Sequence, residues 1–196
     1  SGERLQLGVL EKEDWLYRAL HGRTIVFSKD IYSKFTTMTH GLDVSKGIKA
    51  LINNESALEG IFHITSKESL RWSEVLDIYL SILEKHLGHR PNILLQSLPS
   101  FLKWAPSKYQ VLYDRAYNRT FNNNKISQSI DVDSFIFVRE GIKSSLEGFL
   151  EKTDFKYVNW KSEALKDKQT KERTSTKEII GFKQKIKYLV FRYLLN

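Results

Sequence analysis

Hydrophobic residues recur along the chain at two spacings, one typical of helices and one typical of short strands. The clearest helical pattern runs from Trp72 to Leu87, where apolar side chains recur at intervals of one, three or four residues. Gly88 and Pro91 are residues that stop helices, so we expect this helix to end near Leu87. Apolar residues at helical spacing also predict helices over 9–20, 43–54, 109–117 and 138–150.

Short apolar runs between these helices predict strands. They lie at 24–27, 35–39, 60–64 and 93–95. His40 and Gly41 follow the second run and form a corner between a strand and the helix expected to begin at Asp43. Because strands alternate with helices and hairpin turn signals are few, the pattern predicts a mixed α/β or α+β domain.

The length and composition suit one domain, or one domain with an extension. The chain has 196 residues, of which 41% are hydrophobic, enough for a core. It has no cysteine, which excludes disulfides and thiolate metal sites and favours a reducing, cytoplasmic location. The sequence contains no run of about 18 apolar residues, so we predict no membrane-spanning helix. Residue 1 is not methionine, so we expect a processed, trimmed or engineered stretch of polypeptide.

Charge divides the chain at residue 151. Residues 152–196 hold 12 basic and five acidic residues, a net charge of +7, whereas residues 1–151 hold 19 and 18, a net charge of +1. We therefore predict a nearly neutral body over 1–151 and a basic helical extension over 152–196. A basic charge confined to the end of the chain argues against general nucleic-acid binding, and we expect no nucleic-acid partner.

The extension contains two candidate helices, a basic one over 155–170 and an amphipathic one over 179–195. We expect the apolar side of the second to cover the body or a partner subunit, with its cations in water. The alternative is that residues 174–196 dock on an anionic membrane surface, which basic amphipathic segments bind.

Motifs for catalysis and cofactor binding are absent from the sequence. The ten glycines are too dispersed to form a G-x-G-x-x-G or Walker loop, so we expect no nucleotide cofactor on this chain alone. His86 and His89 flank a helix end, and no metal site is assigned. Tyr157 and Lys161 match Tyr-x-x-x-Lys, but one such match is expected by chance in a chain this rich in tyrosine and lysine. No catalytic residue is assigned.

Segments spread over residues 10–150 nevertheless form an ordered set. They are 16–27 (LYRALHGRTIVF), 40–44 (HGLDV), 60–65 (GIFHIT) with 70–74 (LRWSE), 121–126 (FNNNKI) and 139–142 (REGI). In order and spacing they resemble the C-terminal half of the extended short-chain dehydrogenase/reductases, the NAD(P)-dependent epimerase/dehydratase family.

This resemblance implies an α/β fold that is the substrate-binding lobe of an extended Rossmann-type enzyme. The cofactor-binding half, with the glycine-rich loop and the catalytic Tyr-x-x-x-Lys, would lie upstream. NAD or NADP would be bound by the whole enzyme, and this chain alone would be inactive. Many family members place an arginine four residues before the corner histidine, where it contacts a substrate diphosphate, whereas here that position is Thr36, with Lys34 nearby.

The resemblance implies a small-molecule substrate, a nucleotide-sugar or a related hydroxyl or carbonyl compound. Candidate substrate-binding residues are Arg23, Val26, Lys34, Arg115 and Arg119. The alternative for each arginine is an ordinary solvated surface position. A surface made for the missing half should also promote self-association. The competing function is a stand-alone, non-catalytic binding module whose basic end docks on a membrane or a partner.

Overall fold

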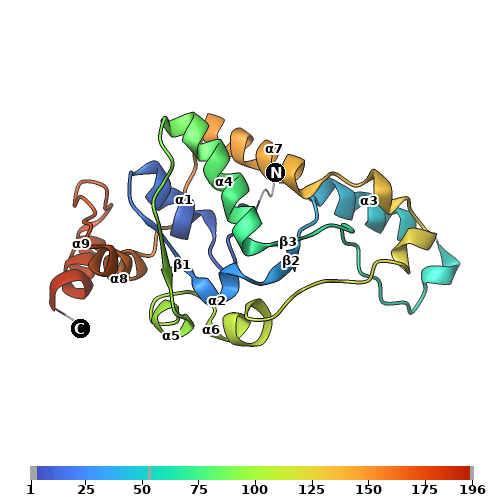
Figure 1. Ribbon diagram of the computed structural model, residues 1–196, viewed down its shortest axis with the longest axis horizontal. Coiled ribbons are helices and arrows are strands. Elements are labelled where there is room, and N and C mark those ends of the chain that lie inside the picture. The colour runs from blue at the N-terminus through green and yellow to red at the C-terminus, as the bar shows by residue number, and fades with distance from the viewer. Residues whose placement is uncertain (1–3, 53, 195–196) are drawn as a thin grey trace.

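The computed structural model describes residues 4–52 and 54–194, in which helices and short strands are mixed (Figure 1). The helices are α1 (Lys12–Leu20), α2 (Lys29–Tyr32), α3 (Gly41–Leu51), α4 (Trp72–Leu87), α5 (Leu98–Phe101), α6 (Lys108–Gln110), α7 (Val138–Glu151), α8 (Trp160–Thr170) and α9 (Phe182–Leu189). The strands are β1 (Ile25–Ser28), β2 (Phe35–Thr37), β3 (Ser69–Arg71) and β4 (Ile93–Gln96). Single turns of tighter or wider helix are η1 (Glu55–Ala57), η2 (Val111–Arg115), η3 (Ile126–Gln128), η4 (Val132–Ser134) and η5 (Val190–Leu194). The predicted mixed class is confirmed.

The strands form two separate pairs. β1 and β4 are parallel, with Ile25 opposite Ile93, and β2 and β3 are antiparallel, with Thr36 opposite Leu70. All four residues of β1 are buried, as expected for a strand covered by helices on both faces. The strands predicted near 24–27, 35–39 and 93–95 are thus confirmed.

The strand predicted over 60–64 is wrong, because these residues form an irregular segment, and β2 pairs instead with β3. Phe62 and Ile64 instead pack around Ile126 in a small side cluster. Ile64 lies so close to Gly47 of α3 that a Cβ on that glycine would meet its Cγ2 at 2.4 Å. Of the apolar side chains that suggested a strand, Ile64 therefore packs against α3, whereas Ile61 is exposed.

The core lies between α1, α4 and β1. α4 has the bounds predicted, and Gly88 ends it in a left-handed conformation, with φ of 77°. The rings of Trp15 on α1 and Tyr79 on α4 have centroids 4.5 Å apart. α7 lies beside α4 and covers its other side (Figure 1). This packing gives the molecule one continuous apolar centre.

Several helix boundaries differ from the predicted ones. α1 begins at Lys12 and not near residue 9, because 7–10 form a tight turn closed by an isolated bridge between Leu7 and Leu10. Gly8 in that turn has φ of +64°, and a Cβ there would meet the Phe27 ring at 2.9 Å. The helix predicted over 109–117 is a short α6 followed by the wide turn η2. Residue 53 of the predicted 43–54 helix lies outside the described residues.

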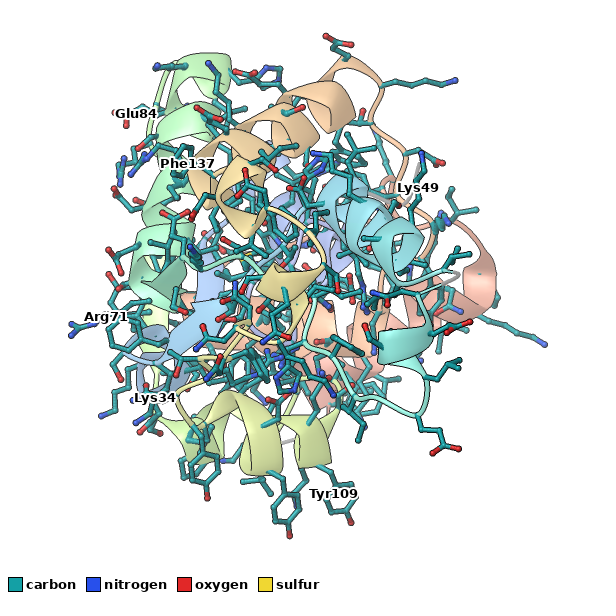
Figure 2. All side chains as sticks on the ribbon, turned by 90° about the vertical axis from the view of Figure 1, so that its right-hand side faces the viewer. Lys34, Lys49, Arg71, Glu84, Tyr109 and Phe137 are labelled. Carbon is teal, nitrogen blue, oxygen red and sulfur yellow. The ribbon has the colours of Figure 1, made fainter. Side chains whose placement is uncertain are left out.

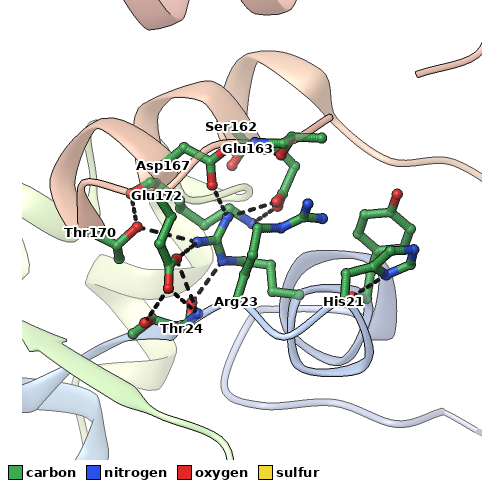
Figure 3. Close-up of polar contacts among 12 residues, drawn as sticks. His21, Arg23, Thr24, Ser162, Glu163, Asp167, Thr170 and Glu172 are labelled. Carbon is green, nitrogen blue, oxygen red and sulfur yellow. Dashed lines mark hydrogen bonds and ion pairs between the residues drawn. The ribbon is translucent and has the colours of Figure 1, made fainter. Parts of the chain in front are cut away.

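The basic extension is fastened to the body by a buried guanidinium. Arg18 on α1 is fully buried, and its Nη1 donates to Glu163 at 2.8 Å and to Asp167 at 2.7 Å, both on α8 (Figure 3). Its Nη2 donates to Glu172 at 2.8 Å, and its Nε donates to the Thr24 carbonyl at 2.7 Å. Burial disfavours the charge, but the Glu163 and Asp167 carboxylates outweigh it and raise the pKa of Arg18.

A second set of polar contacts joins α8 to α1 and to α9. Lys166 is fully buried, and its Nζ donates to the Asp14 carbonyl at 2.7 Å. Asp167 accepts the Tyr188 hydroxyl and the Thr174 hydroxyl, both at 2.7 Å. Because Tyr188 belongs to α9, Asp167 therefore ties α9 to the body.

These contacts bear on two expectations about the extension. The basic helix predicted over 155–170 is α8, which begins only at Trp160, and its charged residues Glu163, Lys166 and Asp167 are buried. The apolar side of the second helix was expected to cover the body or a partner subunit, and in this chain Tyr188 packs against the body whereas Phe182 and Ile186 of α9 are exposed. Residues 195 and 196 lie outside the described part. In residues 4–52 and 54–194, no helix is both long and apolar enough to cross a bilayer.

The first prediction concerns the anchor. Arg18→Met keeps the apolar stem but leaves Glu163 and Asp167 buried without their cation, so it should lower the free energy of unfolding by about 3–5 kcal/mol. Urea unfolding followed by circular dichroism measures this loss. The matched control is Arg90→Met, which removes an exposed arginine paired with Asp77 and Glu84 and should cost no more than about 1 kcal/mol. Equal unfolding midpoints for the two variants would contradict the structural role of Arg18.

The second prediction concerns acid stability. Burial opposes the charge of Asp167, but Arg18 and the Tyr188 and Thr174 hydroxyls lower its pKa below the ordinary 3.8. The stabilisation is therefore present above that value, and it is lost as the pH falls from there through the folded-state pKa. Asp167→Asn should reduce the fall in unfolding free energy between about pH 5 and pH 2.

The wild-type and variant curves are compared over the same pH series. The comparison cancels the contribution of other carboxyl groups, including Asp14, whose pKa burial raises. Parallel curves over this range would show that Asp167 is not coupled to Arg18 as described.

Candidate substrate-binding site

The corner at His40 begins α3 and is held against the segment that precedes α7, far away in the sequence. His40 is the N-cap of α3, where its Nδ1 accepts the Leu42 N–H at 3.3 Å, so the helix begins before the predicted Asp43. Asp43 is buried instead, and its carboxylate accepts the Ile136 N–H at 2.8 Å and the Lys46 ammonium at 2.7 Å. Asp43 thereby holds the start of α3 against the segment that leads into α7.

A cavity of about 560 Å³ opens where these two elements meet. A Cβ on Gly141 of α7 would lie 3.3 Å from the His40 ring, so the glycine permits the close approach of α7 to the corner. The wall is mainly apolar with a few polar groups, as in small-molecule sites. It is formed by Arg4, Leu5, Met38, Thr39, His40, Gly41, Leu42, Ser45, Tyr79, Ile136, Phe137, Val138, Gly141, Ile142 and Ser145.

Tyr79 and Arg4 are polar residues of the cavity wall, the first buried in the core and the second largely exposed. The Tyr79 hydroxyl donates to the Gln6 carbonyl at 3.2 Å, and burial raises its pKa, so it stays neutral and acts only through hydrogen bonds. Arg4 is largely exposed and pairs with Glu11 at 2.7 Å. The lining groups can therefore bind and orient a molecule, with one cation at the rim.

An arginine pair lies on η2 and the segment that follows it. Arg115 and Arg119 both contact the single carboxylate of Asp114, the second through its Nε at 2.6 Å. Arg115 is buried, and its Nε donates to the Gly8 carbonyl at 3.1 Å. Burial and the positive charges of Arg119 and Arg4 lower the pKa of Arg115. Two guanidinium groups facing one carboxylate leave a surplus positive charge, which suits an anion.

The backbone of Arg119 places this pair beside the antiparallel strands. Its N–H donates to the Phe35 carbonyl on β2 at 2.9 Å, and its carbonyl accepts the Thr37 hydroxyl at 3.1 Å. Lys34 precedes Phe35, and its carbonyl accepts the Trp72 N–H at 3.0 Å. Figure 2 shows Lys34 and Arg71 extending from the same side of the molecule.

The five predicted substrate-binding residues do not form a single site. Arg115 and Arg119 lie together, and Lys34 lies next to the β2 residue that binds the Arg119 backbone. Arg23 is buried and donates to Glu178 at 2.9 Å, so its charge serves the attachment of the extension. Val26 is 1% exposed and belongs to the core through β1. The structure thus separates Arg23 and Val26 from the cavity and from the arginine pair.

Two other sequence signals have plain structural outcomes. α8 begins at Trp160, so Tyr157 and Lys161 do not share a helix face, and the Lys161 ammonium lies 4.7 Å from the Phe191 ring centroid. Over the described ranges, no group of three or more histidine and acidic side chains could hold a metal ion.

The cavity itself was not predicted, although its walls carry two signals that were recognised. The corner at 40–44 and the helix start at 139–142 both line it or support it. The contact that brings them together, from Asp43 to a backbone amide 93 residues later, leaves no trace in hydrophobic periodicity. The burial of Asp43 behind an ordinary helix start could not be predicted from the sequence alone.

Comparison of the sequence with protein-family models and with curated proteins, and of the fold with solved structures, finds no match. The family resemblance described above therefore stays a prediction, and the site rests on its geometry.

The third prediction tests the corner. Asp43→Ala leaves the Ile136 N–H without its acceptor and removes the ion-pair partner of Lys46, so it should destabilise the protein by about 1–3 kcal/mol. It should also speed amide exchange at Ile136. The control is Asp133→Ala, which removes an exposed carboxylate paired with Lys67 in the same region and should have little effect. An unchanged Ile136 exchange rate would show that Asp43 does not hold the corner.

Proposed function

We propose that this chain is the substrate-binding portion of an NAD(P)-dependent epimerase, dehydratase or reductase that acts on a nucleotide-sugar or a related hydroxyl or carbonyl compound. The observation that supports this most is the corner at His40 and Asp43. The sequence resemblance singles out the same corner, and in the structure it forms one wall of the cavity. In this proposal Arg115 and Arg119 attract the anionic part of the substrate, and the cavity receives the remainder.

The parallel pair β1 and β4 supports the idea that another part of the enzyme is required. In the described residues β1 is paired along one edge only, by β4. Parallel sheets usually contain more strands and are covered on both faces. A two-stranded parallel sheet with a fully buried strand is what an incomplete larger sheet would leave, and the missing strands would belong to the cofactor-binding half.

The residues present do not fit the dinucleotide cofactor itself. A pyrophosphate needs backbone amides presented by a glycine-rich turn between a strand and a helix. β1 passes directly into the four-residue α2, and the Ser28 hydroxyl already accepts the Asp30 and Ile31 N–H groups. We therefore assign no cofactor-binding or catalytic residue here. The chain's own role would be to bind the substrate and orient it toward a nicotinamide held elsewhere.

The fourth prediction is that the chain binds a nucleoside diphosphate sugar but not NAD(H). UDP-glucose is a suitable probe, with UDP and glucose as separate arms, in titrations followed by calorimetry or ligand-observed NMR. Arg119→Ala should weaken UDP and UDP-glucose binding about tenfold or more, because hydrogen bonds to charged groups contribute about 1.5–3 kcal/mol.

The matched control for this titration is Arg90→Ala, which removes an exposed arginine paired with Asp77 and Glu84 and should leave binding unchanged. No binding of any diphosphate, or equal binding by the Arg119 variant, would contradict the proposal. Micromolar NAD(H) binding by this chain would contradict the assignment of the cofactor to another part of the enzyme.

A further inference from the structure

The last helix carries an apolar stripe that the body does not cover. Phe182, Ile186, Leu189 and Tyr193 follow one another at intervals of four, three and four residues, which places them on one helical face. Their exposed fractions are 77%, 46%, 36% and 52%. At 1.5 Å per residue the stripe is about 16 Å long. A solvent-facing stripe of large apolar side chains marks an interaction surface.

The opposite face of the same helix is fixed to the body. Tyr188 is fully buried, and its hydroxyl donates to Asp167 in the Arg18 anchor. Phe191 packs against the apolar cluster that contains Tyr188 and Trp160, and the Lys161 ammonium lies over its ring. Turning the stripe inward would expose Tyr188 and break its hydrogen bond, so the outward orientation is built into the fold.

Cations border the stripe on both sides. In the order of a helical wheel, Lys183 and Lys187 lie on one flank and Lys185 lies on the other. None of the three forms an ion pair with any residue in the ranges 4–52 and 54–194. Their uncompensated charge accounts for three of the seven excess positive charges of the extension.

We propose that α9 and η5 dock on an anionic membrane surface. The stripe would enter the boundary between headgroups and acyl chains, and the flanking lysines would reach lipid phosphates while their stems cover apolar surface. Tyr193 has the amphipathic ring that favours this interface. The charge distribution identifies the occupant, because a second copy of the chain would bring the same unpaired lysines face to face and would be repelled.

The position of the helix suits such docking. α8 and α9 lie at one end of the molecule, and α3, which borders the cavity, lies toward the other end (Figure 1). A membrane bound at α9 would therefore leave the cavity open to solvent. This proposal does not depend on the proposed enzyme function, because it uses no residue of the cavity or of the arginine pair.

The fifth prediction is tested by flotation of the whole chain with two kinds of vesicle, phosphatidylcholine alone and phosphatidylcholine mixed with phosphatidylserine. The wild type should float with the anionic vesicles and release as salt is raised. Phe182→Ser with Ile186→Ser should reduce binding tenfold or more. Lys183→Glu with Lys187→Glu should reduce it at least about twentyfold, since each cation near the surface contributes about fivefold.

The matched control is Leu58→Ser with Ile61→Ser, which removes two exposed apolar side chains, 74% and 84% exposed, far from α9 in the sequence. This variant should float like the wild type. Circular dichroism confirms folding of each variant, and the lysine pair still tests the proposal if the apolar pair fails to fold.

Three outcomes would overturn the proposal: no flotation with anionic vesicles, flotation of the α9 variants equal to the wild type, or a dimer in sedimentation that the Phe182 and Ile186 changes dissolve. The last outcome would identify the stripe as a contact between copies of the chain.

Discussion

The burial of one guanidinium group determines how the two ends of this chain are joined. Arg18 lies on the helix that packs against the core, and it is removed from water completely. A buried cation is tolerated only where carboxylates and hydrogen-bond acceptors replace its hydration. Glu163, Asp167 and Glu172 supply that replacement from the extension, and the Thr24 carbonyl supplies it from the body. The extension is therefore an internal part of the fold. Its net charge is basic, but two of its carboxylates, those of Glu163 and Asp167, are buried against Arg18.

The burial of Arg18 also orients α9, the helix that follows α8. The second carboxylate oxygen of Asp167 accepts hydrogen bonds from the Tyr188 and Thr174 hydroxyls. The anchor therefore also fixes α9, and the other face of that helix points outward. The same α1 helix contributes Trp15, whose ring packs at a tilt against that of Tyr79 at the inner wall of the cavity. One helix thus contacts the extension with a charged residue and supports the candidate site with an apolar one. The two proposed surfaces share a scaffold without sharing residues.

The sequence predicted the parts of the fold that hydrophobic periodicity controls. α4 matched to the residue because its apolar face is regular and Gly88 ends it, and β1 matched because it is a short apolar run. Periodicity failed where polar groups are buried. The charged residues Glu163, Lys166 and Asp167 of α8 are buried, and the hydrophobic pattern of this segment gives no indication of it. The carboxylate partners of Arg18 lie 145 residues or more away, a distance at which no local rule operates. The corner at 40–44 and the helix start at 139–142 were recognised separately, but the cavity between them was not, because the contact of Asp43 with a remote amide is equally non-local.

Native-state hydrogen exchange tests the anchored extension most directly. The free energy of opening is measured for the amides of α8 and of α4 in the same sample, over a series of denaturant concentrations. If Arg18 and its carboxylates make the extension part of the cooperative unit, the most protected amides of α8 will exchange only through global unfolding, with the same opening free energy as those of α4. Exchange of every α8 amide through a separate opening of much lower free energy, while α4 stays protected, would contradict this account.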